Sequence, residues 1–142
     1  MLKLLVLIDG SEKSTRAAQY AIWLVRSSKE PMEVHLLNIQ LPVTFGDIGK
    51  FVSQEALDAY YQEEGLKVLK GPRDLLVAAG VPHTVQIRVG PIAESIDRYV
   101  NEAGCNQIIM GTRGLGAISS LLLGSVATKV ISISRIPVTL VK

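Results

Sequence analysis

The sequence predicts a single α/β domain whose parallel β-sheet is covered by helices on both faces. Five short apolar runs recur along the 142 residues, and the first is almost continuous, as expected of a strand buried on both sides. Segments with apolar residues at helical spacing separate the runs. Strands that alternate with helices in this way are typical of parallel sheets with helices on both faces.

The first strand is predicted at residues 3–8, "KLLVLI", which end at Asp9-Gly10-Ser11. Ser11 or Ser14 can cap the helix that follows. That helix is indicated by apolar residues at helical spacing, namely Ala17, Ala18, Ala21, Ile22 and Val25. A second strand is predicted at 33–39, and residues 42–52, which contain Pro42, Gly46 and Gly49, are predicted to form a loop.

A second helix is predicted from about Ser53 to Leu69, with Ser53 as its cap. Gly71 and Pro72 are expected to kink or break this helix, because proline removes one backbone donor and crowds the preceding turn. The apolar stretch that follows then completes the helix up to Gly80, a typical C-terminal cap.

Three more strands and two more helices follow. Residues 83–89 alternate like a strand, and Pro91 suits the first turn of a helix that ends at Gly104. That helix carries one apolar stripe, formed by Ile92, Ile96, Tyr99, Val100 and Ala103. A strand at 107–111, a helix at 124–135 and a last strand at 137–141, with Pro137 at its start, complete the prediction.

Composition excludes several classes of protein. The net charge of +2, with scattered Lys and Arg, gives no basic stripe for a nucleic acid. No apolar segment is long enough to span a bilayer, and the apolar run at the amino terminus lacks the cleavage pattern of a signal peptide. A single cysteine, Cys105, excludes an internal disulfide framework. We therefore expect a cytoplasmic protein with no nucleic-acid or membrane partner.

The stretch "GTRGLGAISSLLLGSVATK", residues 111–129, is the main candidate for a binding site. It is not a P-loop, because no lysine follows Gly116 or Gly124. The dinucleotide pattern also fails, because the turn after the first strand is "DGSEKS". What remains is Gly111, then Gly114 after two residues, then Gly124-Ser125 after nine.

These glycines have a physical interpretation as a cradle for an anion. Gly111 and Gly114 let the backbone approach a ligand and adopt conformations closed to other residues. Gly124-Ser125 opens a helix whose free N–H groups favour negative charge, and Ser125 caps that helix or bonds a phosphate oxygen. The intervening "LGAISSLLL" is expected to fold back over the site with its leucines packed on the sheet.

The same residues also fit a flexible loop followed by a capped helix, and the glycine count alone does not separate the two interpretations. Position favours a ligand. Asp9 and Gly111 each lie at the carboxyl end of a predicted strand, where parallel sheets bind ligands near the switch point of their topology. Arg113, within the loop, either pairs with a phosphate or is a solvated loop residue.

Other conspicuous side chains are interpreted as structural. The two histidines, at positions 35 and 83, lack the Cys or carboxylate spacing of a metal site. Cys105 is expected to be a small buried residue, and the leucines at 121–123 are expected in the core. Lys129 is expected to be a surface charge. Four aromatic side chains are expected to pack helices, namely Trp23, Tyr60, Tyr61 and Tyr99.

Together these motifs resemble the universal stress protein family over essentially the whole chain. The resemblance is carried by "VLIDGSEKSTRAAQYAI", "EVHLLNI", "VGPIAESI", "IIMGTRGLG", "LLLGSVATKVI" and "PVTLVK". The spacing from Gly111 through Gly114 to Gly124-Ser125 is similar to the family's nucleotide-binding signature, G-x2-G-x9-G-(S/T). The resemblance implies a Rossmann-like sheet in the order 3-2-1-4-5, of the adenine nucleotide α-hydrolase type. It also implies ATP binding, with Mg²⁺, and dimerisation through the last strand.

The resemblance also implies a role for individual positions. Asp9 would meet the adenosine part of ATP with Ile8 beside it, and the backbone of Ile39 would face the adenine. The ribose and phosphate side would be lined by Met110, Gly111, Thr112 and Gly114. The phosphates would be held by Gly124, Ser125 and Val126. Many relatives read G-D-P-A-E where this chain has Gly90-Pro91-Ile92-Ala93-Glu94, and some carry a hydroxyl residue at the position of Ala127.

Two functions remain open. One is an ATP-binding regulatory or stress-response module with slow or no hydrolysis; the other is an ATP-hydrolysing or adenylate-forming enzyme. No Ser/His/Asp grouping falls near the glycines, so we assign no catalytic or metal-binding residues. A phospho-accepting receiver domain needs an aspartate after the third strand, where this chain has Gly90-Pro91. The last strand, with Val138–Val141, is a candidate edge for a homodimer, only partly blunted by Pro137 and Lys142.

Overall fold

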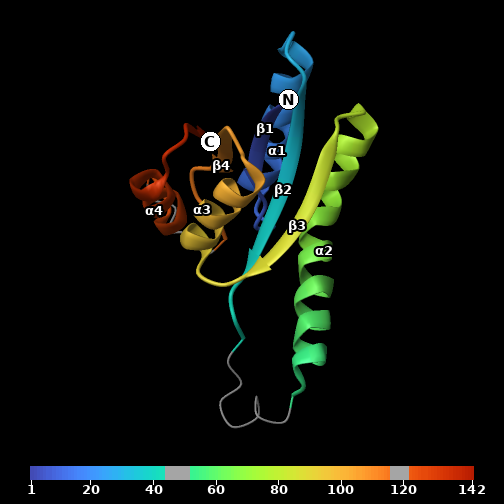
Figure 1. Cartoon of the computed structure of the whole chain (residues 1–142), viewed down its shortest axis with the longest axis vertical. Helices are drawn as coiled ribbons and strands as arrows, with labels where there is room; N and C mark the ends of the chain where they lie inside the picture. Colours follow the sequence, from blue (N-terminus) through green and yellow to red (C-terminus); the bar gives the residue numbers. More distant parts are fainter. Residues whose placement is uncertain (44–51, 116–121) are drawn as a thin grey trace.

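A five-stranded sheet forms the centre of the computed structural model, which describes residues 1–43, 52–115 and 122–142 (Figure 1). The strand order is β3-β2-β1-β4-β5, and all neighbouring strands are parallel, as expected from the sequence and its resemblance. The strands are β1 (Leu2–Leu7), β2 (Met32–Gln40), β3 (His83–Val89), β4 (Gln107–Gly111) and β5 (Val138–Val141).

The strand β1 lies at the middle of the sheet and is the point where its topology reverses. Leu5 lies opposite His35 of β2 on one side and opposite Ile108 of β4 on the other. The chain builds outward through β2 and β3, then returns across β1 to add β4 and β5. The carboxyl ends of β1 and β4 are therefore neighbours, which is the geometry that opens a ligand crevice in such sheets.

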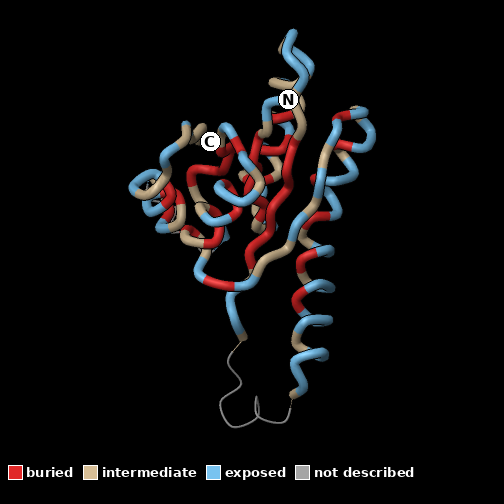
Figure 2. Tube along the Cα trace, in the orientation of Figure 1, coloured by how far each residue is buried: buried red, intermediate tan, exposed pale blue. Residues whose placement is uncertain are grey.

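Alternation along the strands divides the core into two layers. Leu4, Val6 and Ile8 pack against the helices α1 (Glu12–Ser27) and α2 (Gln54–Ala79). Leu5 and Leu7 pack on the other face against α3 (Ile92–Ala103) and α4 (Ser125–Ile133). Burying each such leucine stabilises the fold by roughly 1.5–3 kcal/mol. Figure 2 shows this buried centre along the middle strands.

The predicted helix caps are confirmed at four positions. Ser11 accepts a hydrogen bond from the backbone N–H of Ser14 at 3.2 Å, and Ser53 accepts one from Ala56 at 3.1 Å. Gly80 and Gly104 end α2 and α3 in the left-handed conformation that glycine adopts without strain. Pro91 lies one position earlier than expected, as the cap of α3 and not in its first turn.

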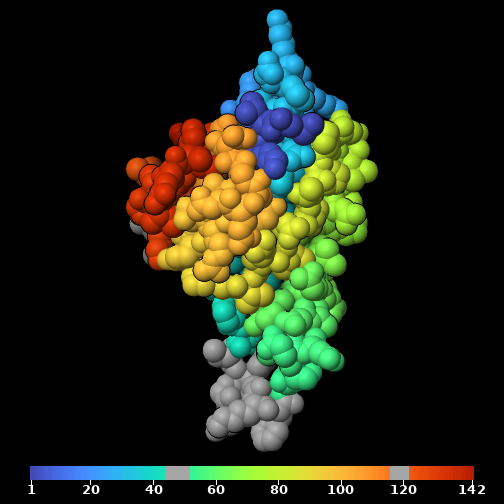
Figure 3. All heavy atoms as spheres, viewed as in Figure 1, coloured from blue at the N-terminus to red at the C-terminus, as the bar shows by residue number. Residues whose placement is uncertain are grey.

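The expected break at Gly71-Pro72 does not occur, because α2 runs continuously from Gln54 to Ala79. Pro72 removes one intrahelical hydrogen bond, but it is itself buried, and Leu69 and Leu76 on either side of it are completely buried. Packing of this helix face on the sheet outweighs the lost bond. The first turns of α2 project past the end of the sheet (Figures 1 and 3).

Several side chains expected to pack helices or to lie in the core are exposed instead. Trp23 is 59% exposed, Tyr60 is 45% exposed and Leu122 is 90% exposed, whereas Tyr61 and Cys105 are buried as expected. The exposure of Leu122 contradicts the expectation that the leucines after Gly114 pack on the sheet. The rest of that stretch, residues 116–121 with Gly116, lies outside the described residues. Over the described ranges, no helix has both the length and the apolar character of a membrane span.

Candidate functional site

A cavity of about 710 Å³ opens at the carboxyl ends of β1, β2 and β4. Its floor is formed by the residues at these strand ends, and its sides by the start of α1, the first half of α2 and the first turn of α4. A cavity of this size lies within the range typical of small-molecule sites. It is also located where the topology of the sheet places a crevice.

Nine of the ten residues predicted from the sequence line this cavity: Ile8, Asp9, Ile39, Met110, Gly111, Gly114, Gly124, Ser125 and Val126. The tenth, Thr112, is not among the described lining residues. Its backbone N–H donates to the carbonyl of Val141 at 3.0 Å, and its carbonyl accepts from the N–H of Gly124 at 2.8 Å. Thr112 therefore fixes the start of α4 against the end of β5, and its predicted contact with a ligand stays a prediction.

The carboxylate of Asp9 is held in one orientation by the turn that follows β1. Its Oδ1 accepts from the backbone N–H of Ser11 at 2.9 Å and from the hydroxyl of Ser11 at 2.5 Å. The other oxygen, Oδ2, lies so close to Gly114 that a Cβ at that position would overlap it. The turn after β1 and the loop after β4 thus meet across the cavity floor.

Close approach, not unusual backbone conformation, is what requires glycine in the loop. Among the described glycines, positive φ occurs at Gly10, Gly80, Gly90 and Gly104, so the predicted strained conformations at Gly111 and Gly114 are absent. A Cβ on Gly111 would lie 2.8 Å from Cβ of Lys13. A Cβ on Gly124 would lie 3.3 Å from Cα of Arg113. The glycines therefore let three backbone segments pack against one another beside the cavity.

The first turn of α4 faces the cavity without a side-chain cap. Gly124 is the N-cap residue, and among the described residues no side chain caps the first turn, so Ser125 does not cap the helix. The first backbone bond into the helix runs from Thr128 to Gly124, at 3.0 Å. Within the described ranges the N–H groups of Ser125, Val126 and Ala127 have no partner, and they lie at a helix end that favours negative charge.

Polar residues that the sequence did not single out support the walls. Asn38 is buried, donates to the carbonyl of Ile8 at 2.8 Å and accepts from Gln40 at 2.6 Å. The hydroxyl of Ser14 donates to the carbonyl of Ser11 at 2.8 Å. The bond from Asn38 joins β2 to the end of β1, and the bond from Ser14 fixes the start of α1. No motif marks Asn38, since a lone amide within an apolar strand has no distinctive spacing.

One side of the cavity, contributed by α2, was also missed. Tyr60, Glu64 and Val68 line it at intervals of four residues, which places them on one helix face. The charged side chains among the described lining residues are Asp9, Glu64 and Arg113. The regular spacing was a usable signal, but Tyr60 was interpreted as a packing residue.

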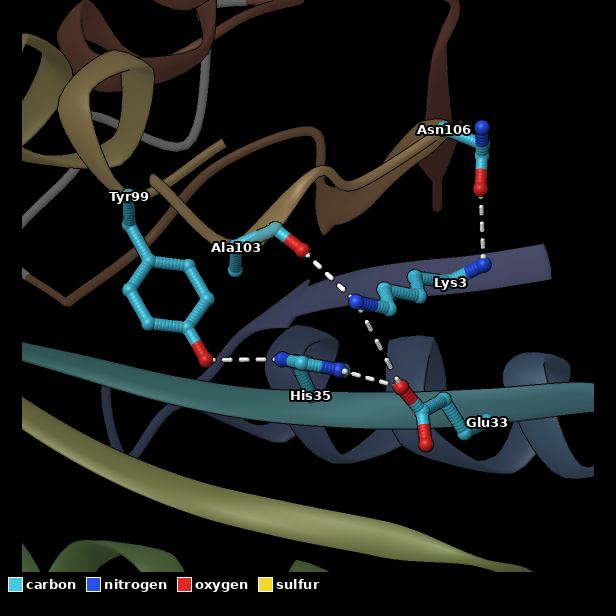
Figure 4. A network of polar contacts seen from close by, with 6 residues as sticks. All are labelled: Lys3, Glu33, His35, Tyr99, Ala103 and Asn106. Carbon is cyan, nitrogen blue, oxygen red and sulfur yellow. Dashed lines mark hydrogen bonds and ion pairs between the residues drawn. The ribbon is translucent and has the colours of Figure 1, made fainter. Parts of the chain in front are cut away.

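The histidines and the cysteine lie away from the cavity. At the amino ends of the strands, His35 bonds the hydroxyl of Tyr99 at 2.7 Å and the carboxylate of Glu33 at 3.1 Å (Figure 4). His83 bonds the carbonyl of its neighbour Val81 at 2.8 Å. Burial raises the pKa of the Cys105 thiol to about 11, so it is un-ionised at neutral pH. Within the described part of the chain, no group of His, Cys, Asp or Glu is arranged to hold a metal ion.

An ion pair joins α3 and α4 below the first turn of α4. Lys129, predicted as a surface charge, is half-exposed and pairs with Glu94 in the first turn of α3. The hydrogen bond from Lys129 lowers the pKa of the Glu94 carboxyl. Glu94 also belongs to the segment where this chain departs from the family pattern, and the pair fixes that segment to α4.

Comparison with known proteins identifies relatives over the full length. A model of the universal stress protein family matches residues 1–142. The universal stress protein YxiE of Bacillus subtilis is 29% identical over 145 residues, which cover 99% of this chain and 98% of that protein. The solved structure of MJ0577 superposes with a TM-score of 0.85 at 28% identity, covering 99% of this chain and 95% of that one.

Two further solved structures share the fold and contain nucleotides. A universal stress protein in complex with cAMP has a TM-score of 0.71 at 23% identity, over 99% of this chain and 95% of that one. An Arabidopsis thaliana protein of this type with AMP bound also has a TM-score of 0.71, at 21% identity, over 100% of this chain and 92% of that one. At such identities the likeness shows the fold alone.

Proposed function

The chain belongs to the universal stress protein family, and from this premise we propose that it binds an adenine nucleotide in the cavity at the carboxyl ends of β1, β2 and β4. The observation that carries the proposal is the junction of the glycine loop with α4. There, closely packed backbone segments border a helix end that no described side chain caps, and this end faces a cavity of suitable size.

The proposed ligand lies with its phosphates at the start of α4. Of the predicted phosphate residues Gly124, Ser125 and Val126, the last two supply N–H donors there, because the N–H of Gly124 already donates to Thr112. The hydroxyl of Ser125 has no capping role. The base lies toward Ile39 at the end of β2, and Asp9, beside Ile8, meets the ribose. Met110, Gly111, Thr112 and Gly114 form the remaining part of the predicted site.

We further propose that the physiological ligand is ATP with Mg²⁺. The two related structures with cAMP and AMP support an adenine compound as the class of ligand. Among the described lining residues, two carboxylates stand against the single guanidinium of Arg113. A triphosphate would therefore depend on backbone donors and on a bound divalent cation to offset its charge. The expected role is a nucleotide-dependent regulatory module in the cytoplasm with slow or no hydrolysis.

The proposed assembly is a homodimer through β5. In the described chain β5 pairs with β4 on one side only. The N–H of Ile108 bonds the carbonyl of Pro137 and that of Thr112 bonds Val141, so alternate residues face β4. Leu140 lies one position before Val141, so its N–H and carbonyl point to the open edge of the sheet. Sedimentation equilibrium should give a dimer for the wild type and a monomer for Leu140→Pro, whereas Leu140→Ala, which keeps the N–H, stays dimeric.

Isothermal titration calorimetry with ATP, ADP, AMP and cAMP, each with and without Mg²⁺, tests the proposed ligand. We expect ATP to bind and its affinity to fall when Mg²⁺ is removed, with a smaller effect of Mg²⁺ on AMP. Mass spectrometry of the purified protein should identify any adenine nucleotide that co-purifies. A folded protein that binds none of the four overturns the proposal, and rapid release of ADP would favour the enzymatic alternative.

A further inference from the structure

The side of the cavity formed by α2 has three side chains on one helix face. Tyr60, Glu64 and Val68 follow one another at intervals of four residues, and all three line the cavity. Val68 reaches the floor, because its methyl groups lie 3.8 Å from the position of a Cβ on Gly10. The three residues, here called the α2 wall, therefore extend along the cavity to the turn after β1.

A glycine brings the α2 wall close to the sheet. Gly65 packs against Ile87 of β3, and a Cβ on Gly65 would lie only 2.6 Å from Cδ1 of that side chain. Glycine inside a helix is unfavourable relative to alanine, so its presence here needs a packing reason. The close contact supplies that reason. It lets α2 approach β3 at the turn that carries Glu64.

The ring of Tyr60 is held in place although it is partly exposed to solvent. It meets the ring of Tyr61 edge to face, with centroids 5.9 Å apart and an interplanar angle of 62°. Tyr61 is buried, and its hydroxyl accepts from the backbone N–H of Val43 at 2.8 Å. Tyr60 is therefore an aromatic surface supported from one side and 45% exposed beside the cavity.

Charge distinguishes the two sides of the cavity. The uncapped end of α4 lies on one face of the sheet and attracts anions, while Glu64 lies on the side formed by α2, on the other face. Oε1 of Glu64 pairs with Lys67 at 3.2 Å, and the side chain stays 37% exposed. If the phosphates of a ligand lie at α4, its uncharged end lies near the carboxylate of Glu64. That end is favoured if it donates hydrogen bonds.

We propose that the α2 wall recognises the base of the nucleotide, with Tyr60 stacking on the purine ring and Glu64 accepting a hydrogen bond from its exocyclic amine. The inference rests on the proposed function, since it assigns the base end of that same site. It adds residues that the glycine signature does not contain. It also gives Gly65 a role as the residue that positions the wall.

Stacking is tested by the affinity of Mg-ATP for variants of Tyr60. Loss of a base–aromatic contact should weaken binding about tenfold in Tyr60→Ala and in Tyr60→Leu, while Tyr60→Phe, which keeps the ring, should bind like the wild type. Leu66→Ala is the matched control, because Leu66 is 49% exposed on the same helix and does not line this cavity. Equal affinity of wild type and Tyr60→Leu, both folded by circular dichroism, overturns the stacking role.

Recognition of the amine is tested by pairing a change in Glu64 with a change in the ligand. The wild type should bind Mg-ATP several-fold more tightly than the triphosphate of purine riboside, which lacks the exocyclic amine. Glu64→Met should remove this preference. Glu63→Met should keep it, because Glu63 also pairs with Lys67, at 3.7 Å, but does not line the cavity. The coupling between ligand and residue isolates the contact from general effects on stability.

The two proposals fail in different ways. If the wild type binds no adenine nucleotide, the proposed function fails and the wall has no base to recognise. If the wild type binds Mg-ATP but both triphosphates respond equally to Glu64→Met, only the role of Glu64 is overturned. If binding is unchanged in all Tyr60 and Glu64 variants, the site holds a nucleotide without the α2 wall.

Discussion

At the amino ends of β1 and β2 the polar side chains bond to one another, whereas at the carboxyl ends of the same strands polar groups border a cavity of about 710 Å³. Both ends of the sheet contain a carboxylate, a hydroxyl and a basic side chain, so the types of residue present do not distinguish the two ends. The difference lies in whether the polar groups use their bonding capacity within the protein. Polar groups that bond one another stabilise the fold, whereas polar groups without a partner can bind a ligand.

The network at the amino ends is closed (Figure 4). Because a carboxylate only accepts, His35 donates from Nε2 to Glu33, and its Nδ1 accepts from the hydroxyl of Tyr99. Lys3 donates from Nζ to the carbonyl of Ala103 at 2.9 Å, and its backbone N–H donates to Asn106 at 2.9 Å. Among the described residues, no buried side-chain nitrogen or oxygen lacks a partner.

At the carboxyl ends, backbone N–H groups in the first turn of α4 have no partner among the described residues. Oδ1 of Asp9 accepts from Ser11, but no side chain of the described ranges caps the first turn of α4. Exposed helix N–H groups beside a cavity attract an anion, whereas a satisfied network offers nothing to a ligand. The comparison therefore predicts that changes at the cavity reduce binding and that changes at the closed network reduce stability.

The largest effect is expected from Gly114→Ala, which adds a single methyl group and should weaken ligand binding. A methyl group in Gly114→Ala overlaps Oδ2 of Asp9, so the carboxylate and the loop must move apart. We expect the affinity for Mg-ATP to fall on the order of 100-fold, about 2.7 kcal/mol, as measured by calorimetry. The fold should persist, because φ at Gly114 is not positive and alanine is permitted there.

Gly71→Ala is the matched control for this prediction. Gly71 lies within α2, and nothing lies within 4 Å of a Cβ at that position. The control should bind like the wild type and gain up to about 1 kcal/mol of stability, since alanine favours a helix more than glycine. Unchanged affinity in Gly114→Ala would mean that the contact between Asp9 and the loop does not shape the binding site.

The fold was largely predictable because its signals are local and repeated. Continuous apolar runs such as that at residues 3–8 identify buried strands, and Ser11, Ser53 and Gly80 mark helix ends through local hydrogen bonds and backbone conformation. The predicted break of α2 at Pro72 was wrong because that prediction used only the local sequence. The effect of this proline on α2 depends on the burial of Leu69 and Leu76 against a distant sheet, which the local sequence does not contain.

The part of the candidate site formed by the glycine signature was predictable from the spacing of its residues. The part formed by α2 was not, because it depends on how the helix packs on the sheet. The glycine signature placed Gly111, Gly114 and Gly124 beside one cavity, although the reason for glycine was close approach and not unusual φ. From the sequence, Tyr60 is expected to pack helices, and the structure places it beside the cavity instead. The adjacent Tyr61 is buried, so the exposure of Tyr60 depends on which side of α2 faces the rest of the assembled fold.

A smaller effect, on stability alone, is expected at the closed network from Tyr99→Phe. The change removes one hydroxyl and leaves Nδ1 of the buried His35 without the donor that satisfies it at 2.7 Å. An unsatisfied buried group of this kind costs about 1–3 kcal/mol of unfolding free energy, measured by urea denaturation at pH 7. The ring and its contact with Arg88, 5.4 Å from the centroid, remain.

The pH dependence of the same variant separates the hydroxyl from the packing of the ring. Burial raises the pKa of the Tyr99 hydroxyl above its ordinary value of 10.0, so the folded protein keeps this proton at a pH where the unfolded chain releases it. Wild-type stability should therefore fall as the pH rises above 10, and Tyr99→Phe should lose less over that range. The buried thiol of Cys105, whose pKa rises from 9.0 to about 11, contributes a loss of the same sign in both proteins. The affinity for Mg-ATP should be the same in both at pH 7, and a large drop in Tyr99→Phe would show that the two ends of the sheet are coupled.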